Sequence, residues 1–170
     1  MNIFVLDLDV KKCAEYHNNR HCVKMILEQT QILCGVHHII NPTSEIPYRL
    51  THKNHPCSVW VRESRSNYNW AYTLFQELCK EYTFRYGKIH KSWNLSSFLK
   101  DAPLSLPEKG LTTFPQAMPD YCKRSSAVDA YQAYYLLEKS SIAKWTNRPV
   151  DRKSTRLNSS HANISYAVFC

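Results

Sequence analysis

The chain has 170 residues, and its 22 Lys and Arg against 14 Asp and Glu give a net charge of +8 at pH 7. Its three Gly leave no room for a P-loop or a dinucleotide-binding fingerprint, and no apolar run approaches the ~20 residues of a membrane span. No signal peptide and no CxxC pair accompany the cysteines, so we expect reduced thiols in a cytoplasmic protein. The basic balance suits a polyanionic partner such as nucleic acid, and equally an ordinary basic surface.

The pattern of apolar residues predicts an all-α protein, with one compact domain over residues 1–150. The first segment, MNIFVLD, is apolar and is expected to be extended or strand-like. Asp9 is a good cap for a short first helix, and Pro56 and Gly87 suit the start and end of a long one. The expected helices span residues 10–17, 20–38, 56–86, 90–99 and 127–144. The stretches between them that contain several prolines, residues 41–55 and 101–121, are expected to be loops.

The last twenty residues, DRKSTRLNSSHANISYAVFC, differ from the rest of the chain. They show no apolar period and no cap, and they resemble the conceptual translation of a sequencing adapter. We therefore treat residues 151–170 as a tail that does not belong to the natural protein. This tail holds three basic residues and one acidic residue, so the charge of the remaining chain falls by two, to +6.

A line of polar residues runs along the helix expected at residues 20–38. Steps of three and four place its members on one face: His21, Lys24, Glu28, Gln31 and Gly35. Apolar residues occupy most of the remaining circumference, so the line is expected to face a cleft, where a carboxylate, an ammonium and an imidazole can do acid–base work. The alternative is a solvated stripe with an ordinary Lys24–Glu28 pair.

The loop THKNHPC precedes the helix that begins at Pro56. Because a helix N-terminus attracts anions, this loop is a candidate phosphate site, or else a plain capping loop. Its candidate binding residues are His52, Lys53, Asn54 and His55. Histidine spacing also allows zinc, since His17 and His21 are four residues apart and the loop adds further nitrogen and sulfur ligands. No tight zinc motif exists, and we expect neither a metal nor a cofactor.

Basic and aromatic residues alternate in EYTFRYGKIHKSW, residues 81–93. Basic groups hold phosphates and aromatic faces stack on bases, so this stretch is a candidate nucleic-acid surface. The segment AKWTNRPV repeats the chemistry more weakly. The candidate contacts are Arg85, Lys88, Lys91, Lys144 and Arg148, and the alternative is a basic rim at the end of a helix.

Three stretches together resemble the phage pyrimidine-dimer DNA glycosylases, also called endonuclease V of the denV type. The chain starts with MNIFVLD, and His21 is then followed seven positions later by Glu28 and the run ILCGV, where that family has a His and its catalytic Glu at the same spacing. The stretch NYNWAYTLFQELCKEYTFRYG resembles the family's helix that ends in an ECxxRG-like sequence. The similarity covers residues 1–87, and the sequence style suits a phage-like or metagenomic source.

The resemblance implies a compact all-α enzyme whose N-terminal amine attacks C1′ of the damaged nucleotide. A Schiff base forms, the base leaves, and β-elimination cuts the strand. In this chain Glu28 matches the catalytic glutamate. His17, Lys24 and Gln31, in and next to the same helix, are candidate substrate-binding residues. An α-amine ordinarily titrates near ~7.7–8.0, so a useful fraction is neutral and nucleophilic in the cell. Such a mechanism requires the amine and the Glu28 carboxylate to lie within roughly 10 Å of each other.

Two departures from the family pattern affect this expectation. The family usually has a small residue after Met1, which favours removal of the methionine, whereas Asn2 follows here. The nucleophile is therefore the amine of Met1 or, after processing, of Asn2. The family also has arginines near its Glu, where this chain has Leu27 and Gln31, so the DNA must be held by other groups, such as Lys24, Lys53 and Arg85.

The sequence therefore favours a DNA-repair glycosylase with abasic-site lyase activity, with Met1, Asn2, His21 and Glu28 as candidate catalytic residues. Its expected partner is double-stranded DNA, with no membrane, and we expect it to act as a monomer. Two alternatives remain. One is an enzyme on a nucleotide or modified base that uses the residue 52–55 loop for a phosphate, and the other is a non-catalytic nucleic-acid-binding protein.

Overall fold

A computed structural model describes residues 1–43 and 45–148 of the chain. All regular elements in these two ranges are helical, which confirms the all-α prediction. Residues 151–170, which we interpret as a translated adapter, lie outside the described residues. The α-helices are α1 (Val10–Tyr16), α2 (Asn19–Ile40), α3 (Pro56–Glu63), α4 (Arg65–Tyr86), α5 (Ser96–Leu99) and α6 (Ala127–Lys139). Short 3₁₀ turns cover Lys91–Leu95, Asp120–Cys122 and Ser140–Ile142.

Side-chain caps fix where most of the longer helices begin. Asp9 accepts from the backbone N–H of Lys12 at the start of α1, and Asn18 accepts from His21 at the start of α2. Gly87 ends α4 in the left-handed conformation, with φ of 62°, which costs glycine little. The expected ends of α1, α2 and α4 are thus met to within two residues.

The long helix expected over residues 56–86 is instead two helices, broken at Ser64. Ser64 is extended, with φ of −150° and ψ of 158°, and its hydroxyl caps α4 by accepting from Asn67 at 3.1 Å. The same hydroxyl donates to the carbonyl of Gly110 at 2.7 Å. A serine that satisfies both a helix start and a distant loop stabilises the break. The last helix also ends sooner than expected, at Lys139.

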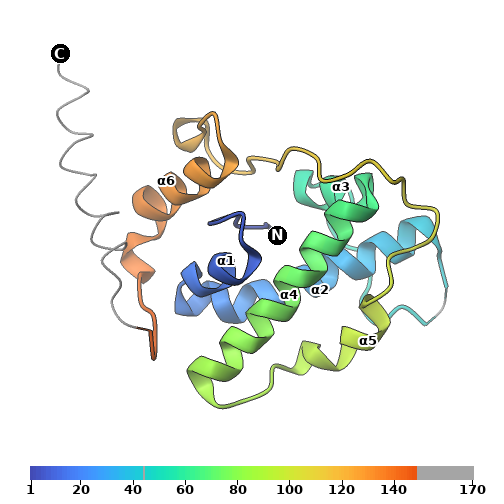
Figure 1. Ribbon diagram of the computed structural model, residues 1–170, viewed down its shortest axis with the longest axis horizontal. Helices are drawn as coiled ribbons and strands as arrows, with labels where there is room; N and C mark the ends of the chain where they lie inside the picture. Colours follow the sequence, from blue (N-terminus) through green and yellow to red (C-terminus); the bar gives the residue numbers. More distant parts are fainter. Residues whose placement is uncertain (44, 149–170) are drawn as a thin grey trace.

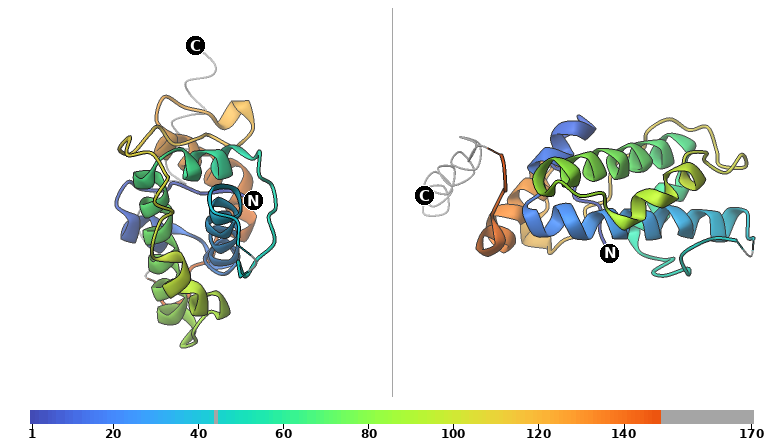
Figure 2. Two further views of the ribbon diagram at one scale, coloured as in Figure 1. Left: turned by 90° about the vertical axis from the view of Figure 1, so that its right-hand side faces the viewer. Right: turned by 90° about the horizontal axis from the view of Figure 1, so that it is seen from below.

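The first six residues run through the middle of the fold. Ile3, Phe4, Val5 and Leu6 are each at most 5% exposed, and they are extended without pairing into a described strand. Figure 1 shows the amino terminus between α6 on one side and α3 and α2 on the other, and the right-hand view of Figure 2 shows that it reaches the edge of the molecule next to α2. Helices α2 and α4 pack against each other beneath this segment. The buried segment therefore presents the chain start to the middle of α2.

Candidate active site at the amino terminus

Glu28 on α2 holds the first two residues of the chain. The backbone N–H of Asn2 donates to Glu28 Oε2 at 2.9 Å, and the amine of Met1 lies 3.7 Å from the same oxygen. On the other side, Lys24 Nζ lies 3.3 Å from Glu28 Oε1. The Glu28 side chain is 11% exposed and that of Lys24 is 69% exposed. The amine and the carboxylate thus meet well within the 10 Å reach that the lyase chemistry requires, at the edge of an open surface.

Hydrogen bonds of the Asn2 side chain hold the first two residues in this position. Its amide donates to the carbonyl of Ala117 at 2.9 Å. Its oxygen accepts from the hydroxyl of Tyr131 on α6 at 3.0 Å and from the thiol of Cys57 on α3 at 3.3 Å. Three distant parts of the chain therefore position one residue. Sequence reasoning did not find these roles of Tyr131 and Cys57, because a residue at position 2 gives no local signal for a partner at position 131.

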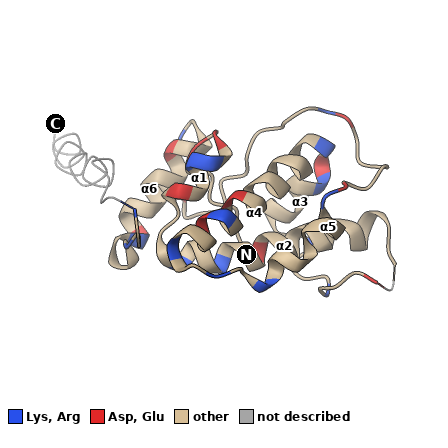
Figure 3. Ribbon diagram, turned by 60° about the horizontal axis from the view of Figure 1, so that its bottom comes forward, with Lys and Arg blue, Asp and Glu red and all other residues tan. Residues whose placement is uncertain are grey.

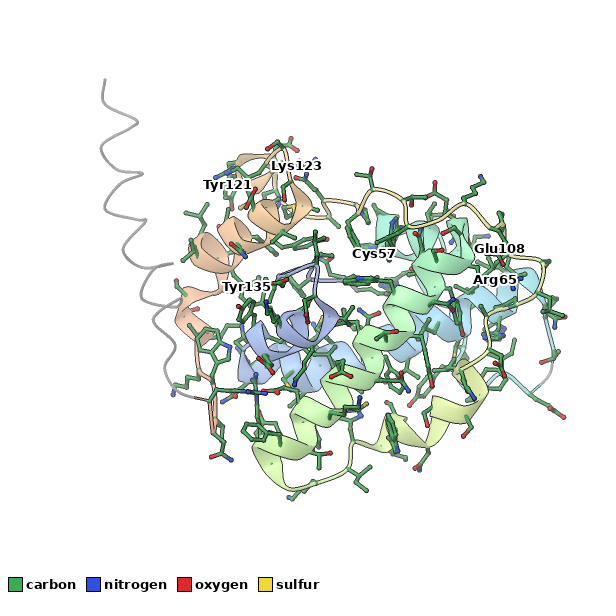
Figure 4. All side chains as sticks on the ribbon, viewed as in Figure 1. Cys57, Arg65, Glu108, Tyr121, Lys123 and Tyr135 are labelled. Carbon is green, nitrogen blue, oxygen red and sulfur yellow. The ribbon has the colours of Figure 1, made fainter. Side chains whose placement is uncertain are left out.

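The first turn of α3 forms the second wall of the site. His55 caps this helix, since its Nδ1 accepts from the backbone N–H of Cys57 at 3.2 Å. The hydroxyl of Ser58 lies 3.6 Å from the Met1 sulfur, and Figure 4 shows Cys57 at the end of α3 that faces the amino-terminal segment. Burial, followed by the charge of the N-terminal amine, lowers the pKa of His55. Its imidazole is then neutral with the proton on Nε2, because Nδ1 is an acceptor.

His21 lies two turns from Glu28 on the same side of α2, and the amino-terminal segment and α6 cover it there. Its ring stacks on Phe4 with centroids 4.4 Å apart, and its Nδ1 lies 2.5 Å from the hydroxyl of Tyr135. His17 is fully buried nearby, with Nδ1 2.7 Å from the carbonyl of Cys13. Burial lowers the pKa of His21 to about 3 and that of His17 to about 4. These positions make both histidines supports of the amino-terminal segment, with Tyr135 beside it in Figure 4.

The exposed face of α2 consequently differs from the expected one. His21, Glu28 and Gly35 are buried, and Gln31 is half-buried. The open face carries Arg20, Val23, Lys24 and Leu27. Since the amino-terminal segment and α6 cover the histidine side, the helix turns Val23 and Leu27 outward, and only one edge of the expected line borders the open surface.

The candidate phosphate loop is exposed and lies close to the amine. His52, Lys53 and Asn54 are exposed, and His52 has a positive φ of 50°. A shallow groove joins this loop to α2 and α3, and Ser58, which contacts Met1, is among its lining residues together with Lys53 and Arg62. Figure 3 shows basic positions on α2 and neighbouring elements around the amino terminus.

Arg85 and Arg148, both expected to contact DNA, are held inside a network around Glu81. Arg85 is 2% exposed and donates to Glu81 at 2.7 Å and to the carbonyl of Glu15 at 3.0 Å. Arg148 donates to Glu81 at 2.9 Å and lies 3.3 Å from the Glu15 carboxylate. Both guanidinium groups therefore join α1 and α4, and that of Arg148 also attaches the segment after α6. The neighbouring candidates Lys88, Lys91 and Lys144 are exposed.

No set of zinc ligands is found among the residues that the structure describes. Within residues 1–43 and 45–148, no three or more His, Cys, Asp or Glu side chains are grouped so as to hold a metal ion. His17 and His21 pack among the aromatic rings near α6, whereas the histidines at positions 52 and 55 lie at α3. Across the same described ranges, no helix is long and apolar enough to cross a membrane.

The chain is thus an all-α domain in which a carboxylate of α2 lies beside the N-terminal amine. A family model described as pyrimidine dimer DNA glycosylase matches residues 1–95, which include the amino-terminal segment and α1 to α4. The chain belongs to this family, and DNA is accordingly its substrate. No curated protein and no solved structure matches the chain.

Proposed function

We propose that this chain removes damaged pyrimidines from double-stranded DNA and then cuts the strand at the abasic site. The N-terminal amine is the nucleophile, and Glu28 is its carboxylate partner. One observation carries the proposal: the two candidate amine nitrogens, those of Met1 and Asn2, lie 3.7 Å and 2.9 Å from the same Glu28 oxygen. A single carboxylate placed on the nitrogen that attacks is the arrangement that covalent amine catalysis needs.

The reaction begins when the neutral amine attacks C1′ of the damaged nucleotide. The N–C1′ bond forms as the bond from C1′ to the base breaks, and the electron pair of that bond leaves with the base. Glu28 takes a proton from the attached nitrogen and returns it to the ring oxygen as the sugar opens, giving a Schiff base. Removal of a proton from C2′ then expels the 3′ phosphate by β-elimination. Glu28 in its anionic form also stabilises the positive charge on the sugar and nitrogen.

The structure accommodates either form of the amino terminus. With Met1 retained, its side chain is 4% exposed and its sulfur lies beside the Ser58 hydroxyl, so the amine is held in place. With Met1 removed, the nitrogen of Asn2 becomes the amine and already lies 2.9 Å from Glu28. The Asn2 side chain is anchored in both forms by Ala117 and Tyr131.

We further propose that a monomer binds the duplex across the exposed face of α2. Arg20 and Lys24 are exposed on that face, and Lys53 is exposed on the neighbouring loop. These cations replace Arg85 and Arg148, whose guanidinium groups are engaged within the protein. Phosphate contacts of this kind orient the duplex without reading its sequence.

Borohydride trapping on a duplex with one abasic site tests the proposal. We expect a covalent protein–DNA adduct whose peptide maps to the first residue of the chain, and we expect Glu28→Gln to lower strand cleavage by at least about 100-fold, the usual scale for a general acid–base group. Glu77→Gln is the matched control, because Glu77 pairs with Lys80 on α4 as Glu28 pairs with Lys24. An adduct on an internal lysine, or unchanged cleavage by Glu28→Gln, would contradict the proposal.

A further inference from the structure

The loop before α3 takes no part in the proposed reaction, although His55 at its end lies beside the amine. The residues that follow His55 contact the first two residues of the chain. The Cys57 thiol donates to Asn2 at 3.3 Å, and the Ser58 hydroxyl lies 3.6 Å from the sulfur of the first residue. Burial lowers the pKa of His55 most, the charge of the amine lowers it further, and the charge of Glu28 raises it. The imidazole is therefore close to both groups that carry the proposed reaction.

One ring nitrogen of His55 is held by the fold, and the other is open to a substrate. Nδ1 accepts from the backbone N–H of Cys57 at 3.2 Å, so Nε2 carries the proton of the neutral ring. Within residues 1–43 and 45–148, no protein group accepts a hydrogen bond from Nε2, and the side chain is half-buried rather than covered. A neutral imidazole that is held in this way presents one fixed N–H donor.

Two cations border the groove next to this loop. The groove lies between α2 and α3, and Lys53, Ser58 and Arg62 are among its lining residues. Ser58 also contacts Met1. Lys53 is exposed two positions before His55, and Arg62 fixes the loop by donating to the Lys53 carbonyl. The amine and the two cations therefore border one surface, where positive charge favours a phosphate next to the reacting sugar.

The last step of the proposed reaction creates a charge that such a donor can stabilise. Glu28, anionic again after it has protonated the ring oxygen, takes the proton from C2′. The electron pair of the C2′–H bond forms the C2′=C3′ double bond as the C3′–O3′ bond breaks, and the 3′ phosphate leaves with the electron pair of that second bond. The phosphate thereby gains a negative charge. An N–H donor aimed at this oxygen stabilises the transition state of elimination and not that of the earlier attack at C1′.

We propose that His55 is a second catalytic residue, whose Nε2–H donates to the 3′ phosphate as β-elimination releases it. The role rests on the proposed function, because a Schiff-base lyase is what expels this phosphate. Two elements then divide the reaction. Glu28 on α2 serves the attack, the ring opening and the proton at C2′, and His55 at the start of α3 serves the departure of the cut strand.

Two substitutions of His55 separate its donor from its capping role. Asparagine has Oδ1 where histidine has Nδ1, so His55→Asn keeps the cap of α3 but ends short of Nε2. Glutamine carries an N–H at about the Nε2 position, so His55→Gln keeps a donor and loses the cap. Borohydride is added at successive times to a single turnover on a duplex with one abasic site. It traps the Schiff base with the strand either intact or cut, which measures the two steps separately.

For His55→Asn we expect Schiff-base formation within about twofold of the unmodified chain and elimination at least about tenfold slower, because a donor to a developing anion is lost. The adduct with the intact strand should accumulate. His55→Gln should eliminate faster than His55→Asn despite a lower midpoint of thermal unfolding. His90→Asn is the matched control, since His90 Nδ1 accepts from the N–H of Ser92 at 3.2 Å and burial alone lowers its pKa. It should change neither step.

Several results would contradict this role of His55. Equal losses of both steps in His55→Asn would show a group that only binds the substrate, and no loss would show a helix cap; either result overturns the proposal. A His55→Gln protein that eliminates no faster than His55→Asn overturns it as well, since the donor would then be irrelevant. An unmodified chain that forms no adduct would instead overturn the proposed function.

Discussion

At the scale of single residues, the position of the amine depends on contacts that do not involve the amine. Asn2 directs its backbone N–H to Glu28, while its side chain is held by Ala117 and Tyr131. The Tyr131 hydroxyl also lies 2.9 Å from the carbonyl of Pro115, so its single proton is shared between the two acceptors. The buried side chain of Tyr131 therefore links the loop before α6 to the start of the chain.

Removal of the Tyr131 hydroxyl should displace the N-terminal amine and slow the chemical step, with only a moderate loss of stability. In Tyr131→Phe the ring remains, but Asn2 and the Pro115 carbonyl lose a buried donor, which costs about 1–3 kcal/mol. We expect a lower midpoint of thermal unfolding together with a fall in kcat that exceeds the fall in substrate affinity, because a misplaced nucleophile affects the chemical step. Thermal unfolding and single-turnover cleavage measure the two effects.

Tyr134→Phe is the matched control for this prediction. Tyr134 is on the same helix and contacts Phe4 and Lys139 through its ring, so loss of its hydroxyl should change neither quantity by much. A Tyr131→Phe protein that is destabilised but cleaves at the normal rate would show that Tyr131 has a purely structural role.

At the scale of elements, α1, α2 and the end of α4 were predicted because local sequence decides them. Asp9 and Gly87 gave the start of α1 and the end of α4, whereas the cap of α2 at Asn18 was found only in the structure. The break at Ser64 was not predicted. The residues around it are compatible with a continuous helix, and the partner that favours the break, the carbonyl of Gly110, lies 46 positions away. Long-range hydrogen bonds of this kind leave no periodic signal in the sequence.

The break at Ser64 gives a direct measure of that long-range contact. Ser64→Ala removes both the cap of α4 and the bond to Gly110 at a fully buried position, so we expect a loss of about 1–3 kcal/mol in the free energy of unfolding. Ser126→Ala removes the cap of α6, where the hydroxyl accepts only at 3.4 Å and is partly exposed, and should cost less. Urea denaturation of both variants compares the two; equal losses would show that the Gly110 contact adds nothing.

The orientation of α2 likewise shows that the sequence predicts the candidate site only in part. Glu28 was found through the family resemblance and through its place in the polar line, and the structure puts it against the amine. His21 was assigned to the same line, but α2 is apolar on most sides, so sequence alone could not tell which side the amino-terminal segment and α6 would cover. Phe4 and Tyr135, which bury His21, come from those two segments.

At the scale of the whole molecule, buried neutral histidines make the fold sensitive to acid. Burial lowers the pKa of His17 to about 4 and of His21 to about 3, from an ordinary value of 6.5. Burial also lowers the pKa of His37, His55 and His90. These groups are spread from the amino-terminal core to the far end of α4, so their effect falls on the global stability.

The sign of the effect follows from which state takes up protons first. As the pH falls below about 6.5, histidines in the unfolded chain become charged while His17 and His21 in the folded chain stay neutral. The unfolded state therefore binds more protons, and the stability that is present above pH 6.5 is lost progressively down to about pH 4 for His17 and about pH 3 for His21. Each such histidine contributes a slope of up to about 1.4 kcal/mol per pH unit within that window.

We therefore expect the free energy of unfolding to fall steadily between pH 7 and pH 5, a range that lies above the ordinary pKa of the carboxyl groups. His21→Gln should reduce this slope, because glutamine can still pair with the Tyr135 hydroxyl but does not titrate. Urea denaturation at several pH values compares this variant with the unmodified chain. A slope that His21→Gln does not alter would mean that His21 is charged in the folded state, and the stacked arrangement of Phe4 on a neutral imidazole would then be untenable.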